Sequence, residues 1–269
     1  MSDLTVRVFE DGTKLGQYLA DRILDTIADA ASDGTSFVLG CPGGRSLRTT
    51  YLALGESAHH RDDVDLSPLI IVMMDEYVTP SSDGFEYVPI DAHFSCRRFA
   101  YEEILGPLAG LRGAPGVERV WVPHPDDPAA HDERIASVGG IDHFLLASGE
   151  SDGHVAFNPP GSDMFSATRV VELAETTRHD NLDTFPAFEG LHEVPTHGVT
   201  IGLGSIVELS LTATLVCTGS AKRRTVNRVR ASSDFDPAWP ATIVHRCRGA
   251  EMLVDRSASG DGKSIKSDK

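Results

Sequence analysis

The chain has 269 residues and a formal net charge of −16, from 24 lysines and arginines against 40 aspartates and glutamates. So acidic a chain argues against nucleic acid or an anionic membrane surface as its main partner. It has no run of 18 apolar residues and no basic N-terminal segment followed by an apolar one, so we expect neither a membrane span nor a secretory signal. The four cysteines lie far apart without CxxC spacing, which favours free thiols in a cytoplasmic protein over a zinc site.

Strands and helices are predicted in alternation along the chain. The first half predicts a helix over residues 15–32, a strand over 36–40, a helix over 47–55, a strand over 69–74, a helix over 92–106 and a strand over 118–122. The second half predicts a helix over 128–138, a strand over 141–147, a strand and the start of a helix within 198–209, a strand over 211–217, a helix over 221–231 and short strands over 243–244 and 251–255. Because apolar strands separated by helices are typical of parallel sheets, we expect an α/β fold with a mainly parallel sheet covered by helices on both faces.

The predicted domain organisation is simple. Residues 1–256 are expected to form one domain, since a chain of this length can bury a single large core. Within it, residues 160–196 are polar and weakly periodic, and we interpret them as a mobile lid over a ligand site. Residues 257–269 contain too little apolar surface to order themselves and are predicted to be a disordered tail.

Two glycine turns between a strand and a helix are candidate anion sites. In the first, Gly43, Gly44, Arg45 and Ser46 follow a predicted strand, and glycines allow backbone N–H groups to surround a phosphate. The alternative is an ordinary tight turn whose arginine is a solvated surface charge. In the second turn, Lys222 lies near a helix N-terminus, where a positive charge is unfavourable unless it shares an anion with the helix.

Three further residues are candidates for proton transfer. Asp75 directly follows the strand over 69–74, where partial desolvation raises the pKa of a carboxyl toward the range of a useful base. A helix cap or loop turn is the alternative for Asp75, and Glu76 beside it is a candidate structural acceptor. Asp152 and His154 follow the strand over 141–147 among glycines and form a compact acid–base pair, because imidazole titrates near neutral pH.

Five motifs in this order resemble the glucosamine-6-phosphate deaminase/isomerase family, whose sister group is 6-phosphogluconolactonase. The resemblance covers roughly residues 5–256 and implies the Rossmann-like sheet shared with ribose-5-phosphate isomerase and CoA transferases. The motifs are Pro42-Gly43-Gly44-Arg45-Ser46 followed by Thr49-Thr50-Tyr51, Met74-Asp75-Glu76-Tyr77, Asp152-Gly153-His154-Val155-Ala156-Phe157-Asn158, Thr176-Thr177-Arg178 and Thr218-Gly219-Ser220-Ala221-Lys222.

The resemblance implies a role for each candidate. Asp75 would move a proton between C2 and C1 of the open-chain sugar, and His154, oriented by Asp152, would open the pyranose ring. The residues that would hold the phosphate of the sugar are Gly43, Gly44, Arg45, Ser46, Lys222 and Arg178. No metal or organic cofactor is implied, because a proton shift next to a carbonyl needs only placed acids and bases.

The sequence departs from the family pattern at several positions. Pro159 stands where the deaminases carry a glutamate that assists the ring-opening histidine. Asp183 stands near the position where the lid of the deaminases carries a phosphate-binding arginine. Arg45, Arg48 or Arg178 would then have to compensate for that arginine. Glu150 replaces a common glycine, and Val171 replaces the lysine of the allosteric site, so we do not expect that regulation.

The sequence leaves three functions open. We expect a sugar-phosphate aldose–ketose isomerase/deaminase that acts on glucosamine 6-phosphate or a close amino-hexose phosphate in amino-sugar catabolism. The alternative is a 6-phosphogluconolactonase-type hydrolase in which His154 activates water, and a third reading is a non-catalytic sensor of sugar phosphates. The expected partner is a small phosphorylated sugar, with no nucleic acid and no membrane, and a homo-oligomer is left open.

Overall fold

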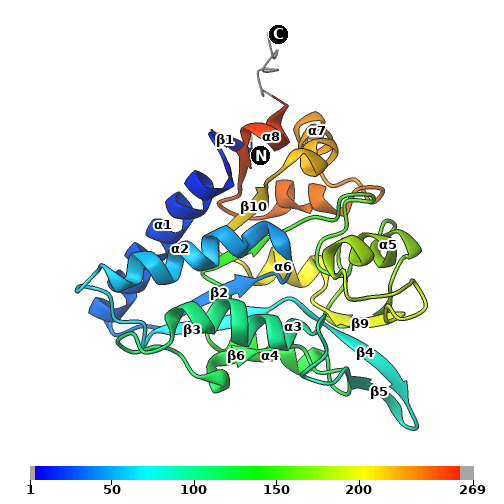
Figure 1. Ribbon diagram of the computed structural model, residues 1–269, viewed down its shortest axis with the longest axis horizontal. Coiled ribbons are helices and arrows are strands. Elements are labelled where there is room, and N and C mark those ends of the chain that lie inside the picture. The colour runs from blue at the N-terminus through cyan, green and yellow to red at the C-terminus, as the bar shows by residue number, and fades with distance from the viewer. Residues whose placement is uncertain (1–3, 261–269) are drawn as a thin grey trace.

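The computed structural model describes residues 4–260 and is built around a seven-stranded sheet, which Figure 1 shows with its covering helices. All the neighbouring strands in this sheet pair in parallel, in the order β1-β11-β10-β7-β2-β3-β6. The strands are β1 (Thr5–Phe9), β2 (Phe37–Cys41), β3 (Leu69–Met73), β6 (Val120–Trp121), β7 (His143–Leu146), β10 (Ala213–Cys217) and β11 (Glu251–Asp255). The parallel α/β sheet expected from the sequence is confirmed.

Helices cover both faces of this sheet, and the alternation of side chains along β2 and β3 shows why. Phe37 and Leu39 belong to one apolar core, whereas Val38 between them belongs to a second core on the other face. The first core is closed by α1 (Gly12–Asp33), α2 (Arg48–His59) and α3 (Cys96–Phe99). The second is closed mainly by α4 (Ala129–Ser137), α6 (Leu203–Leu209) and α7 (Arg223–Ala231). Strands buried on both faces are apolar throughout, as β2 and β3 are.

A second, antiparallel sheet of four strands extends from the first, and the sequence analysis did not predict it (Figure 1). Its order is β5-β4-β9-β8, with β4 (Asp75–Ser81), β5 (Gly84–Tyr87), β8 (Arg169–Glu172) and β9 (His197–Thr200). Only Met74 separates β3 from β4, so the chain passes from one sheet directly into the other at Asp75. Residues 160–196 contribute β8 and α5 (Glu175–Thr184), and their role as a lid stays a prediction.

Several expected boundaries are corrected by the structure. Residues 243–244 lie in the 3-10 helix Pro240–Arg246, so the predicted strand is wrong, and β1 was missed. The tail was expected to be loose from residue 257, but α8 (Arg256–Ser259) is ordered by the side chain of Asp255, which caps it, and by burial of Ala258. Residues 261–269 of that tail lie outside the described residues. In the range that is described, no helix is long and apolar enough to cross a bilayer.

Candidate active site

A cavity opens where four parallel strands end. The loops after β2, β3, β7 and β10 line it together with α5, which is where open α/β sheets place their ligands. The space of the cavity, counted with the part open to solvent, is about 870 Å³. The sequence-predicted residues that line it are Gly43, Gly44, Arg45, Ser46, Asp75, His154 and Lys222.

Asp75 is the first residue of β4 and its side chain is almost fully buried, with 6% of its surface exposed. Burial raises the pKa of Asp75 to about 7; the neighbouring Glu76 adds to this effect, whereas a hydrogen bond from Cys96 and the nearby His154 oppose it. The Cys96 thiol donates to the Asp75 carboxyl across 3.4 Å. A carboxyl group whose pKa lies near neutral pH can accept a proton as a carboxylate base and then return it.

Glu76 holds the neighbouring helix in place and has a structural role. Its carboxylate is fully buried and accepts hydrogen bonds from the backbone N–H groups of Cys96 and Arg97, at 2.9 Å each, and from the Ser95 hydroxyl at 2.8 Å. These bonds satisfy the free N–H groups at the start of α3. They also fix Cys96 against Asp75, so the interpretation of Glu76 as a structural acceptor is confirmed.

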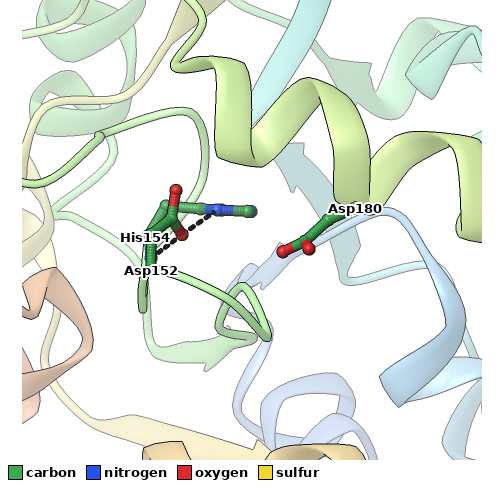
Figure 2. A group of neighbouring side chains, drawn as sticks. All are labelled: Asp152, His154 and Asp180. Atoms are coloured by element: carbon green, nitrogen blue, oxygen red, sulfur yellow. Dashed lines mark hydrogen bonds and ion pairs between the residues drawn. The ribbon is translucent and has the colours of Figure 1, made fainter. Parts of the chain in front are cut away.

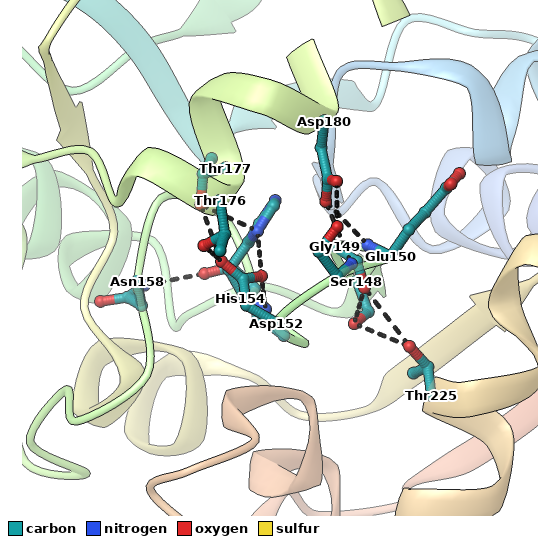
Figure 3. A network of polar contacts seen from close by, with 12 residues as sticks. Ser148, Gly149, Glu150, Asp152, His154, Asn158, Thr176, Thr177, Asp180 and Thr225 are labelled. Carbon is teal, nitrogen blue, oxygen red and sulfur yellow. Dashed lines mark hydrogen bonds and ion pairs between the residues drawn. The ribbon is translucent and has the colours of Figure 1, made fainter. Parts of the chain in front are cut away.

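Asp152 and His154 form a hydrogen-bonded pair on the loop after β7 (Figures 2 and 3). The Nδ1 atom of His154 lies 2.7 Å from Asp152 Oδ1, and the second carboxylate oxygen accepts from the hydroxyls of Thr176 at 2.6 Å and Thr177 at 3.1 Å. Burial opposes the ionised form of Asp152, yet the bonds from His154 and Thr176 outweigh it and lower the pKa of this carboxyl below its usual range. With Nδ1 directed at Asp152, the Nε2 atom of His154 is left for a ligand in the cavity.

The cavity also carries two cations, Arg45 and Lys222. Lys222 is 8% exposed, its Nζ atom donates to the Ser148 carbonyl at 2.6 Å, and burial lowers the pKa of its ammonium. Arg45 extends from the glycine turn, in which Gly44 has a positive φ of 89° that favours glycine. Both cations contact the carboxylate of Glu150, at 3.4 Å for Arg45 and 3.6 Å for Lys222. The two glycine turns thus meet at one place in the cavity, and its role as an anion subsite stays a prediction.

Two arginines are not brought to the cavity. The Arg178 guanidinium donates to the backbone carbonyls of Leu191 at 2.5 Å and Val194 at 3.0 Å and does not line the cavity, so nothing in this structure supports its assignment to the sugar phosphate, which stays a prediction. This side chain instead ties α5 to the segment after it. Arg48 pairs with Glu103 at 3.2 Å and does not line the cavity either.

Sequence reasoning missed several residues that line the cavity. Cys96 and Asp180 lie on helices whose contact with the site depends on the tertiary fold, and Tyr77 and Phe157 form an aromatic wall with ring centres 4.7 Å apart. Asp180 has ligand atoms within 4.8 Å of Asp152 and His154, so these three side chains could hold a metal ion (Figure 2). Each carboxylate already accepts several hydrogen bonds, however, and these bonds account for the cluster.

The chain matches a known protein family along most of its length. The family model for glucosamine-6-phosphate isomerases/6-phosphogluconolactonase matches residues 10–253. The chain belongs to this family. The resemblance inferred from the motifs is thereby confirmed.

Relatives of known name cover most of the chain. The glucosamine-6-phosphate deaminase of Dictyostelium discoideum is 28% identical over 256 residues, which are 94% of this chain and 90% of that protein. The deaminase of Shouchella clausii is 32% identical over 225 residues, which are 82% of this chain and 84% of that protein. The solved structure of a monomeric glucosamine-6-phosphate deaminase has a TM-score of 0.79 at 25% identity and covers 96% of this chain and 99% of its own. A 6-phosphogluconolactonase from Trypanosoma brucei has a TM-score of 0.68 at 18% identity, covers 98% of this chain and 100% of its own, and shares the fold.

Proposed function

We propose that the protein is an aldose–ketose isomerase/deaminase that converts glucosamine 6-phosphate, or a close amino-hexose phosphate, to a ketose phosphate and ammonia. The observation that carries this proposal is the convergence in one cavity of a base, an oriented imidazole and two cations. Asp75 supplies a carboxyl with a pKa of about 7, and the pair of Asp152 and His154 supplies the imidazole. The named deaminases among its relatives support the same reaction.

The reaction follows from where these groups lie. Lys222 and the backbone of the glycine turn hold the phosphate, which places the far end of the sugar among Asp75 and His154. His154 passes a proton to the ring oxygen and takes one from the C1 hydroxyl, so that the ring opens. Asp75 removes the C2 proton to form an enol-type intermediate and returns a proton to C1. The resulting C2 imine takes up water and releases ammonia, which leaves the ketose phosphate.

Ring opening in this protein relies on fewer acids than the family pattern contains. Pro159 carries no ionisable group, and it does not line the cavity. The orientation of His154 therefore rests on Asp152, which Thr176 and Thr177 hold in turn. We assign to this hydrogen-bonded set the task of keeping Nε2 of His154 directed at the ring oxygen.

Two finer expectations belong to the same proposal. The substrate partner is a phosphorylated sugar, because Arg45 and Lys222 are placed for an anionic group. The four cysteines are all free thiols, and three of them are buried. Because disulfides are rare in the reducing cytoplasm, this absence of disulfides supports a cytoplasmic location. The oligomeric state is to be measured by light scattering, with a monomer and a homo-oligomer as its two outcomes.

The test is a pair of assays on the purified protein. Glucosamine 6-phosphate should yield ammonia and ketose phosphate in equal amounts, and Asp75→Asn should lower kcat by a factor of about 10² to 10⁴, the usual contribution of a positioned acid or base. Hydrolysis of 6-phosphogluconolactone is followed in parallel in a pH-stat. Lactone hydrolysis without ammonia release would replace the proposal by the lactonase alternative, and binding without either turnover would favour the sensor.

A further inference from the structure

Glu150 places its carboxylate between the two cations of the anion subsite. One and the same oxygen, Oε1, lies 3.4 Å from Nη2 of Arg45 and 3.6 Å from Nζ of Lys222. An anionic group of a ligand that used both cations would have to stand at this position. Without a ligand, the side chain of Glu150 therefore already occupies the place of the anion.

The charge of the cavity makes this contact consequential. Among the described residues that line it, Arg45 and Lys222 are the lysine and arginine side chains, and Asp75, Glu150 and Asp180 are the carboxyl groups. A phosphate monoester carries between one and two negative charges near pH 7. With Glu150 in place, a phosphate would meet two cations whose charge is already partly offset, together with a carboxylate that repels it. Binding of a phosphate therefore requires the Glu150 carboxylate to leave the two cations.

The contacts around Glu150 hold its backbone more firmly than its side chain. The backbone N–H groups of Glu150 and Ser151 donate to the Asp180 carboxylate, at 3.1 and 3.2 Å, and so does the Ser151 hydroxyl. The backbone is thus tied to α5. The Glu150 side chain is 33% exposed and points away from Asp152 and His154 (Figure 3). Rotation about its own bonds frees Arg45 and Lys222 without disturbing the imidazole.

We propose that Glu150 is a specificity-determining residue that competes with the substrate phosphate for Arg45 and Lys222, an inference that rests on the proposed function. A ligand with a phosphate displaces the carboxylate and gains both cations. A sugar without a phosphate leaves Glu150 in place and gains neither. The net affinity for the phosphate is the difference between its own contacts and those that Glu150 gives up, so removal of the Glu150 charge tightens phosphate binding.

The test is the dissociation constant of inorganic phosphate at pH 7, measured by calorimetry on the whole protein. We expect Glu150→Gln to bind phosphate about 5- to 30-fold more tightly than the wild type, which is about 1 to 2 kcal/mol. The matched control is Glu103→Gln, because Glu103 is also 33% exposed and pairs with an arginine, Arg48, that is 50% exposed like Arg45. Its pair lies outside the cavity, so the control removes one negative charge from the protein and should change the affinity less than twofold.

A second variant and the turnover assay separate the outcomes. Glu150→Asp keeps the charge but shortens the side chain, and its affinity should fall between those of the wild type and Glu150→Gln. The role of Glu150 would be overturned if Glu150→Gln bound phosphate no more tightly than the wild type, or if none of these proteins bound phosphate. It would also be overturned if Glu103→Gln gained as much affinity as Glu150→Gln. Because the phosphate titration needs no turnover, tighter binding without ammonia release would refute the proposed function alone. Ammonia release with unchanged phosphate affinity would refute the role of Glu150 alone.

Discussion

Replacement of Asp75 by asparagine should make the free energy of unfolding less dependent on pH. Burial raises the pKa of Asp75 to about 7 from 3.8 for a solvated aspartate, so the folded state holds the proton more tightly than the unfolded state. The stabilisation is fully present below pH 3.8 and is lost as the pH rises through 7. This loss amounts to about 4 kcal/mol in all, of which more than half falls between pH 5 and pH 8. Asparagine has no proton to lose and escapes this loss.

The assay is urea unfolding of the wild type and of Asp75→Asn at pH 5 and at pH 8. Any constant cost of placing an amide beside Cys96 cancels, because only the change between the two pH values is compared. The stability of the variant relative to the wild type should rise by about 2 to 3 kcal/mol from pH 5 to pH 8. Asp83→Asn, which removes a carboxyl from the exposed turn between β4 and β5, gives the effect of losing one surface charge. A relative stability that stays the same at both pH values would show that Asp75 is not a buried carboxyl with a raised pKa.

Three further changes test other contacts of the site. Cys96→Ala removes the donor that lowers the pKa of Asp75, so the acidic limb of the kcat/KM profile should move to higher pH by about half a pH unit. Cys96→Ser supplies a stronger donor and should move the same limb to lower pH. Gly149→Ala would place a Cβ 2.2 Å from Nδ1 of His154, so we expect kcat to fall at least about tenfold through displacement of the imidazole. Lys222→Gln should raise KM for the sugar phosphate by about 10- to 100-fold, since it removes a charge-assisted contact.

Each of these changes has a control and a contrary result. For the thiol, Cys247→Ala removes a cysteine far from Asp75, and equal shifts of the pH profile in both alanine variants would refute the link to the base. For the glycine, Gly106→Ala has its nearest contact at 3.7 Å and should leave kcat unchanged. For the lysine, an equal rise in KM for an uncharged substrate analogue would show that Lys222 does not act through the phosphate.

The local pattern of the sequence determined most of the main sheet, though not its edge strand β1, and the edge at which the chemistry lies. Strands buried on both faces must be apolar throughout, and such runs separated by helical spacing predict a parallel sheet. The carboxyl ends of parallel strands share one edge, so residues that directly follow different strands converge there. Gly44, Asp75, His154 and Lys222 could therefore be assigned to one cavity from their positions after four predicted strands, and all four line it.

The partners of individual side chains were decided only by the tertiary structure. The strand β4 pairs with β9, far along the chain, and this antiparallel sheet has no signal in the local pattern around Asp75. Glu150 lies between Arg45 and Lys222, and Arg178 bonds to two carbonyls beside its own helix. A sequence shows that a charge is present, but which opposite charge or carbonyl it meets depends on how distant loops approach one another. Hydrophobic periodicity reports only whether a side chain faces the core, so it predicts the sheet and leaves these polar contacts to the packing of the whole chain.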